Sequence, residues 1–210
     1  MNWNIEDIVF LYPPDSFTGS FDNAKMQARH EQQLHEKLEA IKNALTRETD
    51  PLAAMHKLHA RDQLTFLRNN LESFRHAGRV EKAVLAVYGR LNSPFSSGGD
   101  TEIWNSLFAI CDPERLYSLG NQVAFATATV YRGSVTGLVR SLSWTPDRQR
   151  AEGFAERWKD PSLGGGELFE VDIARSNVLV YLKHRHEEEV LLSPAFITSA
   201  EIRAFRSNGL

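Results

Sequence analysis

Apolar residues in the first half of the chain recur at the spacing of helices that pack on one face. A first stripe predicts a helix over about residues 23–46, and it consists of Leu34, Leu38, Ile41 and Leu45. Asp50-Pro51 predicts the start of the next helix, because aspartate caps helices well and proline fits the first position. Two further stripes predict a helix that ends near Gly78 and another from Val80 onwards. They consist of Leu64, Leu67, Leu71 and Phe74, and of Val80, Ala83, Val84, Val87, Tyr88 and Leu91.

The pattern changes after a loop rich in Ser, Pro and Gly at residues 93–99. Beyond it, helices are predicted over residues 102–110, 113–118 and 147–158, the last with Asp147 as its cap. Apolar or β-branched runs predict strands over residues 127–131, 168–173, 178–182 and 190–192. Strands with interspersed helices, without strict βαβ alternation, predict an α+β fold. We expect a helical region over residues 1–95 and a second domain over 96–210.

Composition narrows the class of protein. The 210 residues, 42% of them hydrophobic, suit one domain with an extension. No run of about eighteen apolar residues is present, which excludes a transmembrane helix and a membrane partner. Acidic residues near the N-terminus differ from the basic start of a signal peptide, so we expect a cytoplasmic protein. Acidic and basic residues nearly balance in both halves, which argues against strong non-specific nucleic-acid binding.

Metal and disulfide chemistry are not expected. Cys111 is the single cysteine, so no intramolecular disulfide can form. His56 and His59 have a spacing compatible with a metal ion, but no cysteine or acidic cluster accompanies them. We therefore interpret them as ordinary surface or partly packed histidines.

Three short motifs of the second half carry candidate chemistry, and the first is Tyr131-Arg132-Gly133 at the end of a predicted strand. A strand-end arginine commonly pairs with a surface carboxylate. It also suits phosphate binding, because the planar guanidinium donates two parallel hydrogen bonds and glycine lets a ligand approach the backbone. These residues alone leave both interpretations open.

The second motif, Ser143-Trp144-Thr145, precedes the predicted helix at Asp147. Hydroxyl groups before a helix are usually caps or turn formers, an interpretation that holds for Thr145 in any case. A strand hydroxyl that faces a cleft can instead orient a catalytic carboxylate. Trp144 is expected to pack in the core, with a place in the wall of a ligand pocket as the alternative.

The third motif, Glu187-Glu188-Glu189, runs directly into the apolar segment 190–192. Three adjacent glutamates often form a solvated charge run. In a strand, however, Glu187 and Glu189 share one face and Glu188 points away. Two carboxylates on one face are a recurrent device for breaking a glycosidic bond.

In this order, and with Ala151 six residues after Thr145, the three motifs resemble those of the arginine–serine–glutamate class of mono-ADP-ribosyltransferases, in particular small toxin-like bacterial or phage members. The resemblance covers residues 129–194. Trp144 and Thr145 depart from the family's Ser-Thr-Ser pattern, in which threonine and serine stand at these places.

The resemblance implies a fold of two packed, mainly antiparallel sheets with flanking helices, and NAD as the substrate. In the family the glutamate of the last position is catalytic, which points to Glu189, and the glutamate two residues earlier directs transfer to arginine, which points to Glu187. Ser143 would orient the catalytic carboxylate, with Ser141 as the alternative, and Arg132 would anchor NAD. The implied NAD-binding set is Tyr131, Arg132, Gly133, Ser143, Thr145 and Glu189.

The implied function is transfer of ADP-ribose to a macromolecular acceptor, protein arginine being favoured because of Glu187. An RNA or DNA base is the alternative acceptor, and NAD hydrolysis or an inactive NAD-binding module are the alternatives to transfer. The loop Lys183–His186 lies where the family places its acceptor-recognition turn. A toxin or antiviral defence effector is the expected biological class. Residues 1–95 carry no chemical motif and would serve as a buttress, an acceptor-recognition surface or a docking site for an antitoxin or chaperone.

Overall fold

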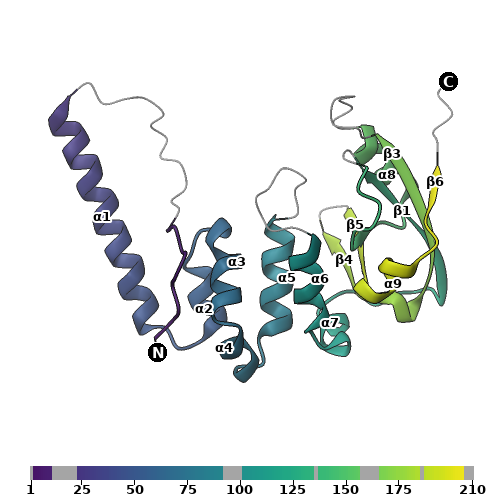
Figure 1. Cartoon of the computed structure of the whole chain (residues 1–210), viewed down its shortest axis with the longest axis horizontal. Coiled ribbons are helices and arrows are strands. Elements are labelled where there is room, and N and C mark those ends of the chain that lie inside the picture. The colour runs from purple at the N-terminus through teal and green to yellow at the C-terminus, as the bar shows by residue number, and fades with distance from the viewer. Residues whose placement is uncertain are drawn as a thin grey trace. The chain divides into compact units, whose positions relative to one another are not determined.

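The structure, a computed structural model of the chain, describes residues 2–10, 23–91, 101–134, 137–156, 166–184 and 187–205. Its helices and two small antiparallel sheets confirm the predicted α+β class (Figure 1). The chain divides into two compact units, Met1–Gly99 and Asp100–Leu210. The predicted boundary between residues 95 and 96 falls outside the described residues and stays a prediction.

The first unit is helical where it is described. Asn23 and Asp50 cap the first two helices by accepting hydrogen bonds from backbone N–H groups of their first turns, and Pro51 takes the first position of α2 as predicted. The core contains fully buried residues of the predicted stripes, such as Leu67, Phe74 and Val84, together with Met55 and Phe66, which were not part of them. The helices are α1 (Ala24–Arg47), α2 (Pro51–His56), α3 (Ala60–Asn69), α4 (Leu71–His76) and α5 (Val80–Leu91).

The prediction of one continuous helix up to Gly78 is wrong, because Asn70 separates α3 from α4. The Asn70 side-chain amide accepts a hydrogen bond from the Asn4 N–H and donates one to the Asn4 carbonyl, both at 2.8 Å. Its Nδ2 also donates to the Phe66 carbonyl at 2.9 Å. The Asn70 amide therefore pairs with the backbone of Asn4 as a neighbouring strand would. Such a side-chain contact leaves no periodic pattern in the sequence, so the break between α3 and α4 could not be predicted.

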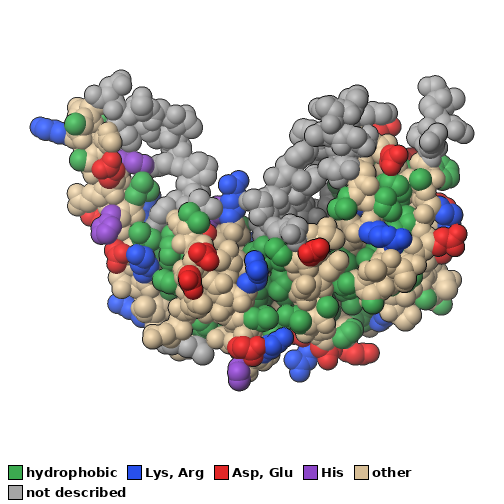
Figure 2. Space-filling view, in the orientation of Figure 1, with side chains coloured by type: hydrophobic (Ala, Val, Ile, Leu, Met, Phe, Trp, Pro, Cys, Tyr) green, Lys and Arg blue, Asp and Glu red, His purple; other side chains and the backbone are tan. Residues whose placement is uncertain are grey.

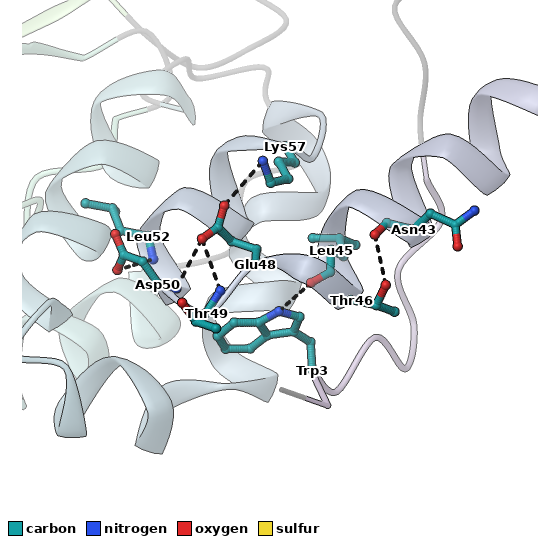
Figure 3. Close-up of polar contacts among 9 residues, drawn as sticks. All are labelled: Trp3, Asn43, Leu45, Thr46, Glu48, Thr49, Asp50, Leu52 and Lys57. Atoms are coloured by element: carbon teal, nitrogen blue, oxygen red, sulfur yellow. Dashed lines mark hydrogen bonds and ion pairs between the residues drawn. The ribbon is translucent and has the colours of Figure 1, made fainter.

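The connection between α1 and α2 is held by polar contacts around Glu48 (Figure 3). The Glu48 carboxylate accepts the N–H groups of Thr49 at 3.0 Å and Asp50 at 3.3 Å, and it pairs with Lys57 Nζ at 3.4 Å. The backbone hydrogen bonds from Asp50 and Thr49, with help from Lys57, lower the pKa of Glu48. Trp3 Nε1 donates to the last turn of α1, which also ties the N-terminal segment to this connection.

The second unit contains all four predicted strands, each longer than predicted. Helix α9 and strand β6 were not predicted. The helices are α6 (Thr101–Ala109), α7 (Pro113–Ser118), α8 (Arg148–Glu156) and α9 (Pro194–Ser199), with a 3-10 turn, η2 (Arg175–Asn177). The strands are β1 (Thr127–Ser134), β2 (Ser143–Trp144), β3 (Glu167–Ala174), β4 (Val178–His184), β5 (Glu187–Leu192) and β6 (Arg203–Phe205).

The strands form two three-stranded sheets, in the orders β1-β3-β6 and β2-β5-β4, and every pairing is antiparallel. Tyr131 of β1 and Thr145, just after β2, connect the sheets by exchanging backbone hydrogen bonds of 2.7 and 2.8 Å. Trp144 is almost fully buried and its Nε1 donates to the Ser141 carbonyl at 2.7 Å, which confirms the predicted core position.

Helix α8 packs directly on β1 at Gly133. A Cβ atom at this position would lie 1.9 Å from the Ala151 carbonyl oxygen and 2.5 Å from the Ala155 nitrogen. Ala151 and Ala155 of this helix are buried, and Phe154 is half-buried. The glycine is therefore required by the close approach of two backbones.

No helix in the described segments combines the length and the apolar character needed to cross a bilayer.

Gly133→Ala is expected to lower the free energy of unfolding by about 1–3 kcal/mol, because the methyl group must displace backbone rather than a flexible side chain. Gly153→Ala, on the same helix but with open space around its Cβ position, serves as the matched control and should raise stability by roughly 0.5–1 kcal/mol. Chemical denaturation of both variants measures the difference. Equal effects in the two variants would contradict the packing argument.

Candidate functional site

The pairing of β2 with β5 places a hydroxyl on a carboxylate. Ser143 lies opposite Leu191 in the register, so Glu189, two residues earlier, is its diagonal neighbour on the same face. Ser143 Oγ donates a hydrogen bond to Glu189 Oε1 at 2.5 Å. Both side chains are only half-buried, so the pair lies within reach of a ligand.

Arg132 joins this pair from β1. Its Nη1 donates to the Ser143 carbonyl at 2.9 Å, and its Nε donates to the Leu138 carbonyl at 3.1 Å. Two acceptors on different segments orient the plane of the guanidinium. Ser143 therefore links two residues that lie 57 positions apart in the sequence, Arg132 and Glu189. Its carbonyl binds the arginine and its hydroxyl binds the glutamate.

Glu188 lies on the other face of β5, as the alternation predicts. Tyr181 Oη donates to Glu188 Oε2 at 2.6 Å, and Lys183 Nζ pairs with Glu188 Oε1 at 3.1 Å. These two hydrogen bonds, that from Tyr181 above all, lower the pKa of Glu188. The same cluster raises the pKa of Lys183 through Glu188, whereas burial is the main cause that raises the pKa of Tyr181.

Glu187 is placed by its backbone, which pairs with His184 at the start of β5. Its side chain lies outside the described part of the structure, as do residues 185 and 186 of the predicted acceptor-recognition loop. The shared face of Glu187 and Glu189 therefore stays a prediction.

The remaining predicted NAD-binding residues lie beside this cluster. Tyr131 and Gly133 alternate with Arg132 along β1, so their Cα positions face the opposite side of the strand. The Asp147 N–H donates to Thr145 Oγ1 at 3.1 Å, and the Asp147 carboxylate accepts from the Arg150 N–H at 3.2 Å. The predicted turn and cap at these two residues are thus confirmed, while NAD binding by Tyr131, Gly133 and Thr145 stays a prediction.

Several contributors to the site were not predicted, because they act through backbone groups. The carbonyl groups of Leu138 and Ser143 hold the arginine, and no side-chain pattern reveals such a role. At the free edge of β4, the Asn121 N–H donates to the Tyr181 carbonyl at 2.6 Å and Asn121 Oδ1 accepts from the Lys183 N–H at 3.0 Å. Gly120 permits this contact, since a Cβ there would lie 2.5 Å from the Tyr181 carbonyl oxygen.

The arrangement provides an oriented carboxylate and an oriented guanidinium that contact the same serine, which suits a ligand that carries both a developing positive charge and a phosphate. Among the described residues, no three His, Cys, Asp or Glu side chains gather in a way that could hold a metal ion. His59, considered above for its spacing to His56, accepts a hydrogen bond from the Arg61 N–H at the start of α3.

Comparisons with known protein families, with curated proteins and with solved structures found no match to this chain.

Glu188→Gln is expected to reduce the free energy of unfolding at neutral pH, by at most about 1 kcal/mol because the carboxylate is partly exposed. The pKa of Glu188 is lowered by folding from its usual 4.5, so its contribution is complete above that value and is lost as pH falls through the lower folded pKa. The difference between wild type and variant should thus vanish in acid. Chemical denaturation of both proteins at a series of pH values, from pH 7 down to values below the folded pKa of Glu188, measures this difference.

Tyr181→Phe is the companion variant for this measurement. It removes the phenol that contributes most to the lowered pKa of Glu188, so the acid-dependent loss should move to higher pH. A wild-type to Glu188→Gln difference that stays constant through the acid range would show that the carboxylate charge has no stabilising partner.

Proposed function

We propose that the second unit binds NAD and transfers its ADP-ribose to a macromolecular acceptor, as the arginine–serine–glutamate class of mono-ADP-ribosyltransferases does. One observation carries the proposal. The Ser143 hydroxyl lies 2.5 Å from the Glu189 carboxylate, and the Arg132 guanidinium lies 2.9 Å from the carbonyl of the same serine. The three motifs that resemble the family in the sequence thus supply three neighbouring side chains.

The architecture supports the same proposal at a coarser level. An ADP-ribosyltransferase-like fold has two packed, mainly antiparallel sheets with flanking helices, and the second unit has two small antiparallel sheets connected through Tyr131 and Thr145. Arg132 comes from the first sheet, whereas Ser143 and Glu189 come from the second. The candidate site therefore lies where the sheets join.

The chemistry demanded of such a site is electrostatic. The nicotinamide of NAD leaves as a neutral molecule from a cationic one, so no acid is needed to protonate it. Positive charge develops on the ribose as the bond breaks, and a carboxylate held next to it stabilises that charge. In the proposed mechanism Glu189 supplies the carboxylate, and the Ser143 hydroxyl keeps it from rotating away.

Arg132 would anchor the pyrophosphate of the substrate. Because its guanidinium plane is already oriented by the carbonyls of Leu138 and Ser143, little conformational freedom is lost on binding. The contact with the Ser143 carbonyl also couples phosphate binding to the strand that carries the orienting hydroxyl. Glu187 would align or deprotonate the acceptor, for which a protein arginine is proposed.

Glu189→Gln is expected to reduce labelling of acceptors by tagged NAD roughly a hundred- to a thousandfold, the usual loss for one well-placed electrostatic group. The amide preserves the size of the side chain and removes its charge. Glu188→Gln is the matched control, since the same change one residue earlier lies on the opposite face and should leave labelling near the wild-type level. Labelling at the wild-type rate by purified Glu189→Gln would contradict the proposed role.

The same assay on whole-cell lysate identifies the acceptor class. Label that is removed by protease supports protein, and loss of label on nuclease treatment would transfer the proposal to nucleic acid. Nicotinamide release without labelled macromolecule would indicate hydrolysis. Absence of both label and nicotinamide release from the wild-type protein would reject catalysis altogether.

Arg132→Ala is expected to weaken NAD binding at least tenfold, because it removes the phosphate anchor, whereas Glu189→Gln should bind NAD nearly as well as wild type. Arg148→Ala is the charge-matched control, since Arg148 pairs with the exposed Glu152 on α8. Isothermal titration with NAD measures the three affinities. If Arg132→Ala and Arg148→Ala weaken NAD binding equally, the loss of affinity reflects net charge, and Arg132 is not the phosphate anchor.

A further inference from the structure

Helix α1 carries an apolar stripe that is only partly covered in the first unit. Of its 24 residues only Leu45 is buried. We define the α1 stripe as Leu34, Leu38 and Ile41, which lie on one face and remain only half-buried in the described structure. Figure 2 shows apolar side chains among basic, acidic and histidine side chains along this helix, at the left of the view.

The α1 stripe is less buried than the apolar face of a helix that packs in a core, although the N-terminal segment contacts the helix, with Lys42 Nζ 5.9 Å from the centre of the Phe10 ring. In proteins most helical stability comes from packing of an amphipathic face rather than from intrinsic propensity. The α2–α5 helices follow this rule, because each of their apolar stripes includes fully buried side chains such as Phe66 and Val84. The α1 stripe lacks such burial, so it has the character of an interface.

The spacing of the stripe identifies a helix as the fitting partner. Leu34, Leu38, Ile41 and Leu45 are separated by four, three and four residues. This is the alternation of the two apolar positions in a coiled coil, where each side chain inserts between residues of a facing helix.

The residues that flank the stripe specify the charge of that partner. The flanking positions of the coiled-coil pattern follow Leu34 and Ile41 and precede Leu38 and Leu45. They hold His35, Lys42, Lys37 and Ala44, with no acid among them. Lys42 pairs with Glu39 at 3.1 Å, but an exposed pair one turn apart contributes little and can be exchanged. In a parallel pair of two α1 helices, Lys37 would face Lys42 of the other copy, which disfavours that pairing.

We infer that the α1 stripe binds an amphipathic helix of a partner protein with acidic residues beside its apolar face. The stripe supplies apolar burial, and Lys37 and Lys42 supply ion pairs at both margins. This interaction lies in the first unit and goes beyond the proposed transfer reaction, which neither requires it nor depends on it.

Two synthetic helical peptides test the inference on the full chain. Both carry leucine at the two apolar coiled-coil positions, one has glutamate at the flanking positions and the other has lysine there. Fluorescence anisotropy should show that the glutamate peptide binds at least tenfold more tightly than the lysine peptide. The double variant Lys37→Glu with Lys42→Glu should reverse this preference. Absent binding of both peptides, or equal binding, overturns the inference.

A pair of double variants separates the stripe from the rest of the helix. Leu34→Asp with Leu38→Asp should lower affinity for the glutamate peptide at least tenfold, whereas Gln32→Asp with Asn43→Asp, two exposed positions on the other side, should not. Circular dichroism checks that both retain helix content. Light scattering tests whether the stripe instead binds a second copy of this chain. A wild-type dimer that dissociates in the Leu34→Asp, Leu38→Asp variant would show this and would overturn the inference.

Discussion

The register between β2 and β5 determines which glutamate meets the serine. With Ser143 opposite Leu191, the diagonal neighbour on the same face is Glu189. A shift of one residue would bring Glu188 to that place and turn Glu189 toward Tyr181. The contacts on the two faces reinforce one another, since Glu188 is held by Tyr181 and Lys183 on one side while Glu189 is held by Ser143 on the other. Two chemically identical neighbours thus acquire different surroundings from strand geometry alone.

The two faces of strand β1 likewise make different contacts. Arg132 extends toward β2 and binds the Ser143 carbonyl, while the next residue, Gly133, receives α8 on the other side. The adjacent arginine and glycine of this motif therefore have separate physical causes. The arginine is required by polar contacts of the site. The glycine is required by the packing of α8, because a Cβ at this position would lie only 1.9 Å from the Ala151 carbonyl oxygen. Because α8 follows β2 directly, its position on β1 also holds the two sheets together.

Most of the fold follows from periodicity, and two of the exceptions share one cause. Stripes and caps predict α1, α2, α5 and α7 closely, and apolar runs predict four strands, because these signals are local. The break at Asn70 and the strand β6 depend on distant partners: Asn70 bonds Asn4, and Arg203 of β6 pairs with Glu170 and Asp172 of β3. In the site, alternation predicts the opposite faces of Glu188 and Glu189. The acceptors of Arg132 are carbonyl groups, which every residue carries and no sequence pattern distinguishes.

Helices α1 and α5 both carry an apolar stripe, but the two stripes differ in width and in burial. In α5 the stripe is wider and residues such as Ala83 and Val87 are fully buried, whereas residues 24–44 of α1 contain no buried side chain. Propensity does not account for the difference, because both helices contain good helix formers. The connection around Glu48 and Trp3 anchors the last turn of α1, and the Phe10 ring lies 5.9 Å from Lys42 Nζ one turn earlier. An apolar stripe of coiled-coil spacing that is anchored at one end, with basic residues at both margins, is the form expected of a surface that a partner helix completes.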